Sequence, residues 1–339
     1  MKTTEWLKTL SDAAGVGGET GATQAAADLL RPLVDEVKID TMGSVLGYRR
    51  CENPNAPTLM LEAHLDEIGL IVTGIDDKGF LQVAKCGGVD PRSLQAQPVV
   101  VFGKQPVRGM ICTTPPHLAG DDKDLPDLSE MAVDVGLSKE EAEKLIAAGD
   151  RIGFAPNFAV LANDRVSGKS LDDRAGCVSV LGALALLKDK PLAVNVIACL
   201  AVQEELGGYG AKAAAFENTP DYCICTDVSF GLTHDAPAHE CGELGKGAML
   251  GISPILDRAF TKRLQALAAA ENIPVQMEVV GGRTGTDADG MTTAHGGIRT
   301  ALLSIPLRYM HTPAETLATA DVEAVARLMA AAAEKGVVD

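Results

Sequence analysis

Apolar residues follow two different spacings along this chain of 339 residues. In residues 1–38 they recur every three or four positions, which predicts helices on both sides of the Gly-rich stretch 17–23. Apolar runs such as 58–63 and 192–200 lead into polar residues, which predicts buried strands. After residue 164 such runs alternate with helix-like segments. This order predicts an α/β fold with a mainly parallel sheet sandwiched by helices.

Several elements outside the N-terminal helices are specific enough to give by range. Predicted strands occupy 44–50, 58–63, 192–203, 222–227, 275–280 and 298–306. Predicted helices occupy 170–189, 207–216, 260–272, 290–297 and 321–336.

The middle of the chain has a different pattern. Short β-like runs alternate there with Gly, Pro and Asp turns, which predicts a small β-barrel or sandwich. It contains one short helix, for which Ser138 is the expected N-cap and Glu141 completes a capping box. The chain therefore divides into an α/β domain formed by 1–68 and 164–339, and an inserted β-barrel domain at 69–163.

Composition narrows the class of protein. Hydrophobic residues make up 46% and charged residues 22%, an ordinary globular mix. The net charge of -16 disfavours nucleic acid or an anionic membrane as a partner. No stretch approaches the roughly 20 apolar residues of a membrane span. The eight Cys form no Cys-x-x-Cys pair, and with no signal-like N-terminus they predict a reduced, cytoplasmic protein.

Candidate metal ligands stand where the predicted strands end. Each has an ordinary explanation alone, such as a hydrogen-bonded His or an Asp N-cap. In a parallel sheet, however, the strand ends share one edge, and carboxylates crowded there raise one another's pKa unless a cation is bound. These residues are His64, the pair Glu204–Glu205, Asp227 and His311 after strands, and Asp172 at the start of a helix.

The composition of this group selects the metal. Imidazole and carboxylate without thiolate suit Zn²⁺, Co²⁺ or Mn²⁺. Five ligands are more than one tetrahedral ion can bind, but Asp172 could bridge two ions. Three protein ligands per ion then leave a position open for water. The two sets would be His64, Asp172 and Asp227, and Asp172, Glu205 and His311.

Glu204 has a different predicted role. Neighbouring side chains of an extended segment point in different directions, so Glu205 can coordinate while Glu204 stays free. A free carboxylate beside metal-bound water can act as a general base. This chemistry predicts a hydrolase.

Three alternatives stay open. A glycosidase, such as an endoglucanase, could use two carboxylates, but it needs no two-metal ligand set, and aromatic residues are only 4%. A di-metal carboxypeptidase or deacylase would need a cation for the substrate's carboxylate, and Arg174, Arg283 and Arg308 are candidates. A non-catalytic scaffold would have no need of a complete ligand set.

Five segments together resemble a known family, the cytosolic di-metal aminopeptidases of the tetrahedral (TET) type. That group includes glutamyl and deblocking aminopeptidases, and some members carry the label endoglucanase or cellulase M. The segments are HLDEIG (64–69), KSLDDRAG (169–176), VQEELGGYGA (202–211), CTDVSFG (225–231) and RYMHTPAE (308–315).

The resemblance implies roles for matching positions. His64, Asp172, Glu205, Asp227 and His311 would bind two divalent ions per subunit, Zn or Co, with Mn possible. Glu204 would be the proton shuttle, and Asp66 would orient His64 through its second nitrogen.

The resemblance also implies a fold and a partner. The fold would be a zinc-aminopeptidase-like domain interrupted by a β-barrel dimerisation module, and dimers would build a homo-oligomer of twelve subunits. The substrates would be short peptides with a free N-terminus. A glutamyl preference would need a cation near the specificity pocket, for which Arg283 in the Gly-rich loop 281–290 is a candidate.

Overall fold

The larger part of the molecule is built on one eight-stranded sheet. The computed structural model describes residues 2–18, 20–53, 55–115, 117–118 and 127–337. In sheet order the strands are β1 (Glu36–Ile39), β2 (Val45–Arg49), β12 (Asn195–Ala201), β3 (Thr58–His64), β13 (Tyr222–Phe230), β16 (Arg299–Leu307), β14 (Ala248–Ile252) and β15 (Val275–Val279).

The sheet is parallel in its centre and mixed at its edges. Strands β12, β3, β13 and β16 run parallel, and β14 and β15 are parallel to each other. The pairs β1–β2, β2–β12 and β14–β16 are antiparallel. The predicted mainly parallel sheet is confirmed at its centre, where the four strands bring their carboxyl ends to one edge. The strands β1 and β14 were not predicted.

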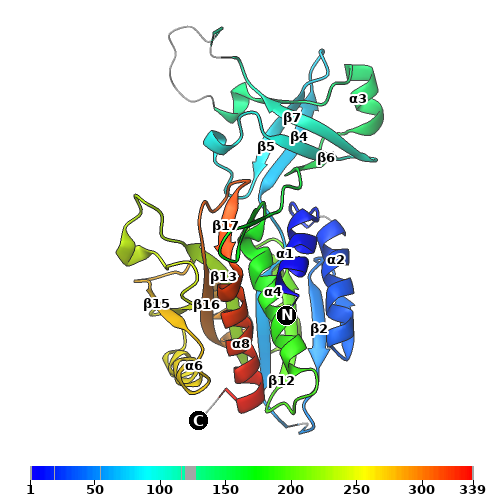
Figure 1. Cartoon of the computed structure of the whole chain (residues 1–339). Coiled ribbons are helices and arrows are strands. Elements are labelled where there is room, and N and C mark those ends of the chain that lie inside the picture. The colour runs from blue at the N-terminus through cyan, green and yellow to red at the C-terminus, as the bar shows by residue number, and fades with distance from the viewer. Residues whose placement is uncertain (1, 19, 54, 116, 119–126, 338–339) are drawn as a thin grey trace.

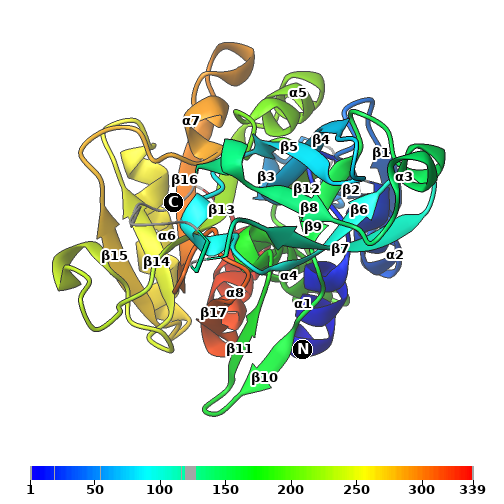
Figure 2. The ribbon, with the colours of Figure 1, turned by 90° about the horizontal axis from the view of Figure 1, so that it is seen from above.

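Helices cover both faces of the sheet (Figure 2). One face carries α1 (Thr3–Asp12), α2 (Thr20–Leu30), α4 (Leu171–Leu187), α6 (Arg258–Ala270) and α8 (Thr319–Lys335). The other carries α5 (Tyr209–Asn218) and α7 (Ala288–Met291). Helices α4 and α8 lie side by side on this face, and residues 171–184 of α4 are all buried. Among the described helices, none is both long and apolar enough to cross a bilayer.

One predicted boundary is wrong. Residues 36–38 were expected to close a helical region, but they belong to strand β1. Pro32 lies in a short 3₁₀ turn, Arg31–Leu33, which follows α2 directly. Proline disfavours α-helix in the residue before it, which explains why α2 ends at Leu30. The chain then turns back, and residues 36–39 pair with β2 as an antiparallel strand.

The predicted barrel is confirmed as a closed six-stranded barrel. Its strands run in the order β4-β5-β8-β7-β6-β9 around their own apolar core. Ser138 caps the barrel's helix α3 (Lys139–Leu145) with Glu141 in the predicted capping box. The strands are β4 (Gly69–Ile75), β5 (Leu81–Cys86), β6 (Pro98–Phe102), β7 (Pro106–Cys112), β8 (Ala132–Asp134) and β9 (Arg151–Phe154).

The barrel stands over the edge of the large sheet (Figure 1). Strand β4 begins five residues after β3 ends, at the edge where the parallel strands terminate. A separate three-stranded sheet lies beside it, made of β10 (Ala159–Leu161), β11 (Arg165–Gly168) and β17 (Glu315–Ala318). Among the described strands, β10 pairs with β11 and with no strand of the barrel.

Candidate active site

Five side chains that can bind a metal meet at the carboxyl edge of the central strands. We call them the rim cluster. Their positions follow from the sheet, because its parallel strands end together. They are His64 at the end of β3, Asp172 at the start of α4, Glu205 after β12, Asp227 within β13, and His311 after β16. Asp227 was expected just past its strand, but β13 continues to Phe230.

Asp172 lies at the centre of the rim cluster. Its Oδ1 is 3.0 Å from Nε2 of His64, and Oδ1 of Asp227 is 3.8 Å from the same nitrogen. Its Oδ2 is 3.2 Å from Nε2 of His311, and that nitrogen is 3.3 Å from Oε1 of Glu205. The two carboxylate oxygens of Asp172 therefore face two different groups of side chains.

The charges of the rim cluster favour binding of a cation. Hydrogen bonds to Asp172 and Glu205 raise the pKa of His311 to about 11. Burial disfavours the charged form of His64, but Asp172 and Asp227 outweigh it and raise the pKa of that imidazole. Each ring therefore holds a proton between carboxylates. Because metal ligation requires neutral imidazole, a divalent ion would take the place of these protons.

His311 is held so that one ring nitrogen faces the rim cluster. Its Nδ1 lies 3.2 Å from the backbone carbonyl of Gly88, a residue after barrel strand β5. A carbonyl only accepts hydrogen bonds, so Nδ1 keeps its proton, and Nε2 is free for a ligand once it gives up its own proton. A Cβ at Gly88 would lie 2.6 Å from Nδ1, so only glycine allows this approach.

Asp66 supports the Glu204–Glu205 pair. Its buried carboxylate accepts the backbone N–H of Glu204 at 3.0 Å and that of Glu205 at 3.3 Å. It lies 3.7 Å from Nδ1 of His64, beyond hydrogen-bond distance, and that nitrogen has no partner in the described part of the chain. The structure thus shows Asp66 holding the turn that carries the two glutamates.

Glu204 faces the cavity beside the rim cluster. Burial, with the nearby charges of Asp287, Glu205 and Asp66, raises the pKa of Glu204 to about 7, although His64 opposes the shift. A carboxylate with this pKa exchanges protons readily near neutral pH.

Glu315 is a supporting residue to which the sequence pattern gave no role. It is 2% exposed, and its two oxygens accept the backbone N–H groups of His311 at 3.0 Å and Asp172 at 3.1 Å. It therefore fixes two members of the rim cluster relative to each other. The signal available in the sequence was an acidic residue four positions after His311, directly before an apolar segment.

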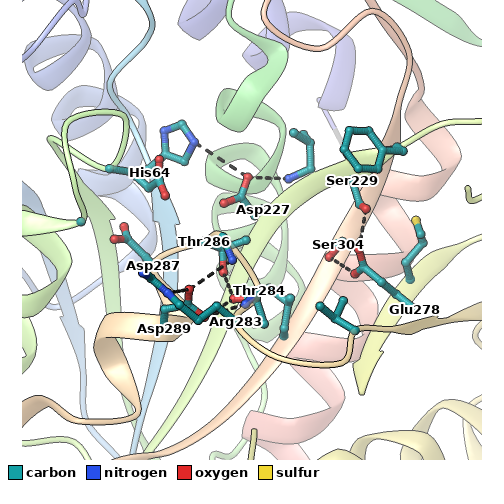
Figure 3. Close-up of a pocket in the computed structure, with 18 of the residues that line it drawn as sticks. His64, Asp227, Ser229, Glu278, Arg283, Thr284, Thr286, Asp287, Asp289 and Ser304 are labelled. Atoms are coloured by element: carbon teal, nitrogen blue, oxygen red, sulfur yellow. Dashed lines mark hydrogen bonds and ion pairs between the residues drawn. The ribbon is translucent and has the colours of Figure 1, made fainter. Parts of the chain in front are cut away.

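Asp287 was also missed. It is 4% exposed and lines the cavity, and neither of its carboxylate oxygens has a hydrogen-bond partner among the described residues. Burial raises its pKa, with Glu62 as its neighbour below the cavity. Figure 3 shows Asp287 at the end of the Gly-rich loop, facing the side of His64.

The cavity has a volume of about 1230 Å³ and extends from the rim cluster along the sheet to β14 and β15. The Gly-rich loop closes one side of it (Figure 3). Asp289 organises that loop by accepting the N–H and hydroxyl of Thr284 at 2.7 and 2.8 Å and the Nε–H of Arg283 at 3.0 Å. This volume accommodates several residues of a peptide.

The three arginines considered for a substrate carboxylate have other partners. Arg174 is fully buried and donates to backbone carbonyls beside β3 and at the end of α1. Arg308 donates to the carbonyl of Leu232 at 2.7 Å. Only Arg283 of the three lines the cavity, with its side chain 86% exposed and its Nε bound to Asp289. The carboxypeptidase and deacylase alternatives thus lose two of their three candidate cations.

Comparison with known proteins agrees with these features. Residues 43–328 match the family model described as M42 glutamyl aminopeptidase. Lysyl aminopeptidase of Pyrococcus furiosus is 36% identical, over 98% of this chain and 96% of that protein. Glutamyl aminopeptidase of Lactococcus lactis is 29% identical, over 92% of this chain and 90% of that protein.

Solved structures share the whole fold. An aminopeptidase from the archaeon Desulfurococcus kamchatkensis has a TM-score of 0.92 at 34% identity, covering 99% of this chain and 95% of that one. The TET1 peptidase of Pyrococcus horikoshii, described as able to assemble into a tetrahedron or a large octahedral shell, has a TM-score of 0.83 at 33% identity, covering 98% and 99%. This protein therefore belongs to the peptidase M42 family of aminopeptidases, hydrolases that act on peptide bonds.

Proposed function

We propose that the chain is a two-metal aminopeptidase that removes N-terminal residues from short peptides with a free amino terminus. The observation that carries this proposal is the placement of Asp172, whose two oxygens face His64 at 3.0 Å and His311 at 3.2 Å. A carboxylate between two imidazoles, each with a further carboxylate nearby, matches a bridging ligand between two ions.

The donor set fits two divalent cations. It combines imidazole nitrogen with carboxylate oxygen and contains no thiolate, which suits Zn or Co, with Mn possible. When bound, such ions would polarise the scissile carbonyl and lower the pKa of water towards 7. One ion would be held by His64, Asp172 and Asp227, and the other by Asp172, Glu205 and His311.

Glu204 is the proposed general base. Asp66 holds its backbone N–H, and its carboxyl group, with a pKa raised to about 7, lines the cavity next to the rim cluster. It would take a proton from the attacking water onto a carboxylate oxygen. It would then donate that proton to the nitrogen of the departing amine, so one residue serves as base and then as acid.

The quaternary structure belongs to the same proposal. The TET neighbour named above assembles into large closed particles, and this chain aligns with 99% of its length. We expect the barrel segment 69–163 to act as a dimerisation domain inserted into a catalytic domain of 1–68 and 164–339, and dimers to build a dodecamer. Light scattering should give about twelve times the subunit mass of 35.3 kDa, and a dimer mass would contradict the dodecamer.

A substrate panel tests the activity. Metal-free protein is reloaded separately with Zn²⁺, Co²⁺ or Mn²⁺ and assayed on aminoacyl p-nitroanilides and their N-acetylated counterparts. Hydrolysis of the free-amine substrates alone supports an aminopeptidase. Cleavage of the N-acetyl amide bond would favour a deacylase. No hydrolysis of any aminoacyl substrate with any metal would overturn the proposal.

A further inference from the structure

A carboxylate lies on the floor of the cavity, away from the rim cluster. Glu278, on edge strand β15, accepts a hydrogen bond from the hydroxyl of Ser229 and one from Ser304 at 2.6 Å (Figure 3). Ser304 is the register partner of Asp227 on the neighbouring strand. Neighbouring strands lie about 5 Å apart. Ser304, and with it the carboxylate of Glu278, therefore lies one strand away from Asp227 of the rim cluster.

A glycine gives Glu278 this reach. Strand β14 lies between β15 and β16, and its Gly251 is the register partner of Glu278. Partners in parallel strands face the same side of a sheet, so Gly251 faces the cavity too. A Cβ there would lie 2.9 Å from the Cβ of Leu302. Without a side chain at this position, Glu278 can extend across β14 to Ser304.

The hydroxyls orient Glu278 without neutralising it. In the described part of the chain no Lys or Arg forms an ion pair with Glu278. An ionised carboxylate offers about four lone-pair sites, and the serines use two of them. The carboxylate thus keeps the capacity to accept further hydrogen bonds from a ligand.

The surroundings of Glu278 suit a long side chain that ends in a cation. Met249 lines the cavity on the same face of the sheet, and methionine adapts to unbranched alkyl chains. Outside the rim cluster, carboxylates outnumber Lys and Arg among the residues lining the cavity by five to two. Arg283, the cation considered for an acidic substrate, is bound to Asp289. An acidic side chain would therefore be repelled here.

We infer that Glu278 determines substrate specificity and selects peptides that begin with a basic residue. This inference rests on the proposed aminopeptidase function. With the scissile bond at the rim cluster, a lysine or arginine side chain runs along the sheet past Met249. Its terminal ammonium or guanidinium donates to the free lone pairs of Glu278.

The first test needs no variant. Lysyl and norleucyl p-nitroanilides share an unbranched four-carbon side chain and differ in the terminal ammonium. The kcat/KM of the metal-loaded protein should be about ten- to a hundred-fold higher for the lysyl substrate, the size expected for a hydrogen bond to a charged group. Glutamyl p-nitroanilide should be the poorest of the three. A lysyl-to-norleucyl ratio near one, or a glutamyl preference, overturns the inference.

Variants assign the effect to Glu278. Glu278→Gln keeps the shape and the serine contacts, and it should bring the lysyl-to-norleucyl ratio close to one while norleucyl turnover changes less than about threefold. Glu278→Lys should shift preference towards the glutamyl substrate. The matched control is Glu217→Gln, which removes a charge from a 52% exposed residue outside the cavity and should leave the ratio unchanged.

Two failures can be told apart. If no aminoacyl substrate is hydrolysed, the proposed function fails. If Glu278→Gln lowers lysyl and norleucyl turnover by the same factor, the aminopeptidase stands and Glu278 has only a structural role. Binding of free L-lysine, measured by calorimetry with L-norleucine as the reference, gives a readout independent of turnover. It should weaken in Glu278→Gln by the same ten- to hundred-fold.

Discussion

Two clusters of buried charge lie side by side and use the same two segments of the chain. Segments 64–69 and 169–176 give His64 and Asp172 to the rim cluster. Three other polar residues of these segments form what we call the ion-pair cluster, and their side chains are buried and charged. These are Glu67, Lys169 and Arg174.

The ion-pair cluster supplies its own counter-charges. Oε2 of Glu67 lies 2.6 Å from Nζ of Lys169, Oε1 lies 3.7 Å from Nη2 of Arg174, and Oε1 also accepts the N–H of Gly15 at 2.8 Å. Burial alone would raise the pKa of Glu67, but Lys169 and Arg174 outweigh it, and the pKa is lowered. This carboxylate is satisfied by the protein itself.

The rim cluster does not balance its charge. Burial, reinforced by the neighbouring carboxylates, raises the pKa of Asp227, and the pKa of Glu204 is raised to about 7 in the same way. Two histidines are the only cationic partners in the cluster. The difference shows how to separate structural from functional buried acids: an acid with a protein cation beside it stabilises the fold, whereas a surplus of acids points to a cation from outside.

The largest effect is expected from Glu204→Gln, which removes one of the surplus acids beside the rim cluster. Loss of a general base should lower kcat by roughly 10²- to 10⁴-fold. We propose that Glu204 is not a metal ligand. The amount of metal bound per subunit and the thermal midpoint should therefore stay the same. Plasma emission spectrometry and thermal melting check these two points, and Glu240→Gln serves as the cavity control. If metal content fell together with turnover, Glu204 would be a ligand.

Glu67→Gln should act in the opposite way, on stability. It leaves Lys169 and Arg174 buried without their carboxylate, which typically costs about 3–5 kcal/mol. Urea unfolding of metal-free protein, at one fixed protein concentration, measures the loss. The control Glu334→Gln removes an exposed pair with Lys190 and should cost less than about 1 kcal/mol. A similar small cost at Glu67 would mean that the two buried clusters do not differ as described.

Much of the rim cluster could be predicted because strand direction carries the information. His64 and His311 follow apolar runs, and the parallel order of the strands places such positions on one edge. The roles of Asp66 and Glu315 could not be predicted, because both accept backbone N–H groups whose directions depend on the turns. The role of Glu278 could not be predicted either, because it depends on the order of β14 and β15 in the sheet.

The helices and strands also divide into those that could be predicted from the sequence and those that could not. Long periodic segments such as 321–336 gave correct helices, because one apolar face fixes both type and extent. Strand β14, Ala248–Ile252, was missed because its short apolar run has no repeat that separates strand from helix. Strand β1 was missed because its sequence, EVKI, continues an apolar spacing that also fits a helix.

Asp66→Asn should have an intermediate effect. The variant keeps one oxygen acceptor but loses the charge and one of the two bonds that hold Glu204 and Glu205. Loss of such a supporting group typically lowers metal affinity or activity by about 10- to 100-fold. Metal titration and kcat measure it. The control is Asp76→Asn in the barrel, where the carboxylate also accepts two backbone N–H groups, and metal affinity should be unchanged. Unchanged kcat and affinity in Asp66→Asn would remove Asp66 from the site.

The smallest effect is the linkage between metal binding and protons. Carboxylates hold His311 at a pKa of about 11 and raise the pKa of His64, so both rings are protonated near neutral pH in metal-free protein. Ligation needs neutral imidazole, so loading both ions should release at least two protons per subunit, one from each ring. Protons compete with the metal ions for the two rings. Lowering the pH below the raised pKa values therefore weakens the apparent metal affinity, by about tenfold per pH unit for each proton displaced. Calorimetric titration in two buffers of different ionisation enthalpy counts the protons.

The control for this count is His239→Gln, which removes an 80% exposed imidazole paired with Glu240 and should leave the released protons unchanged. His311→Gln should reduce the release by one. If wild-type protein releases no protons, then the histidines are already neutral and the ligating carboxylates already ionised without metal. In that case the carboxylates would not hold protons on His64 and His311, and the raised pKa values that we assign to the two rings would be wrong.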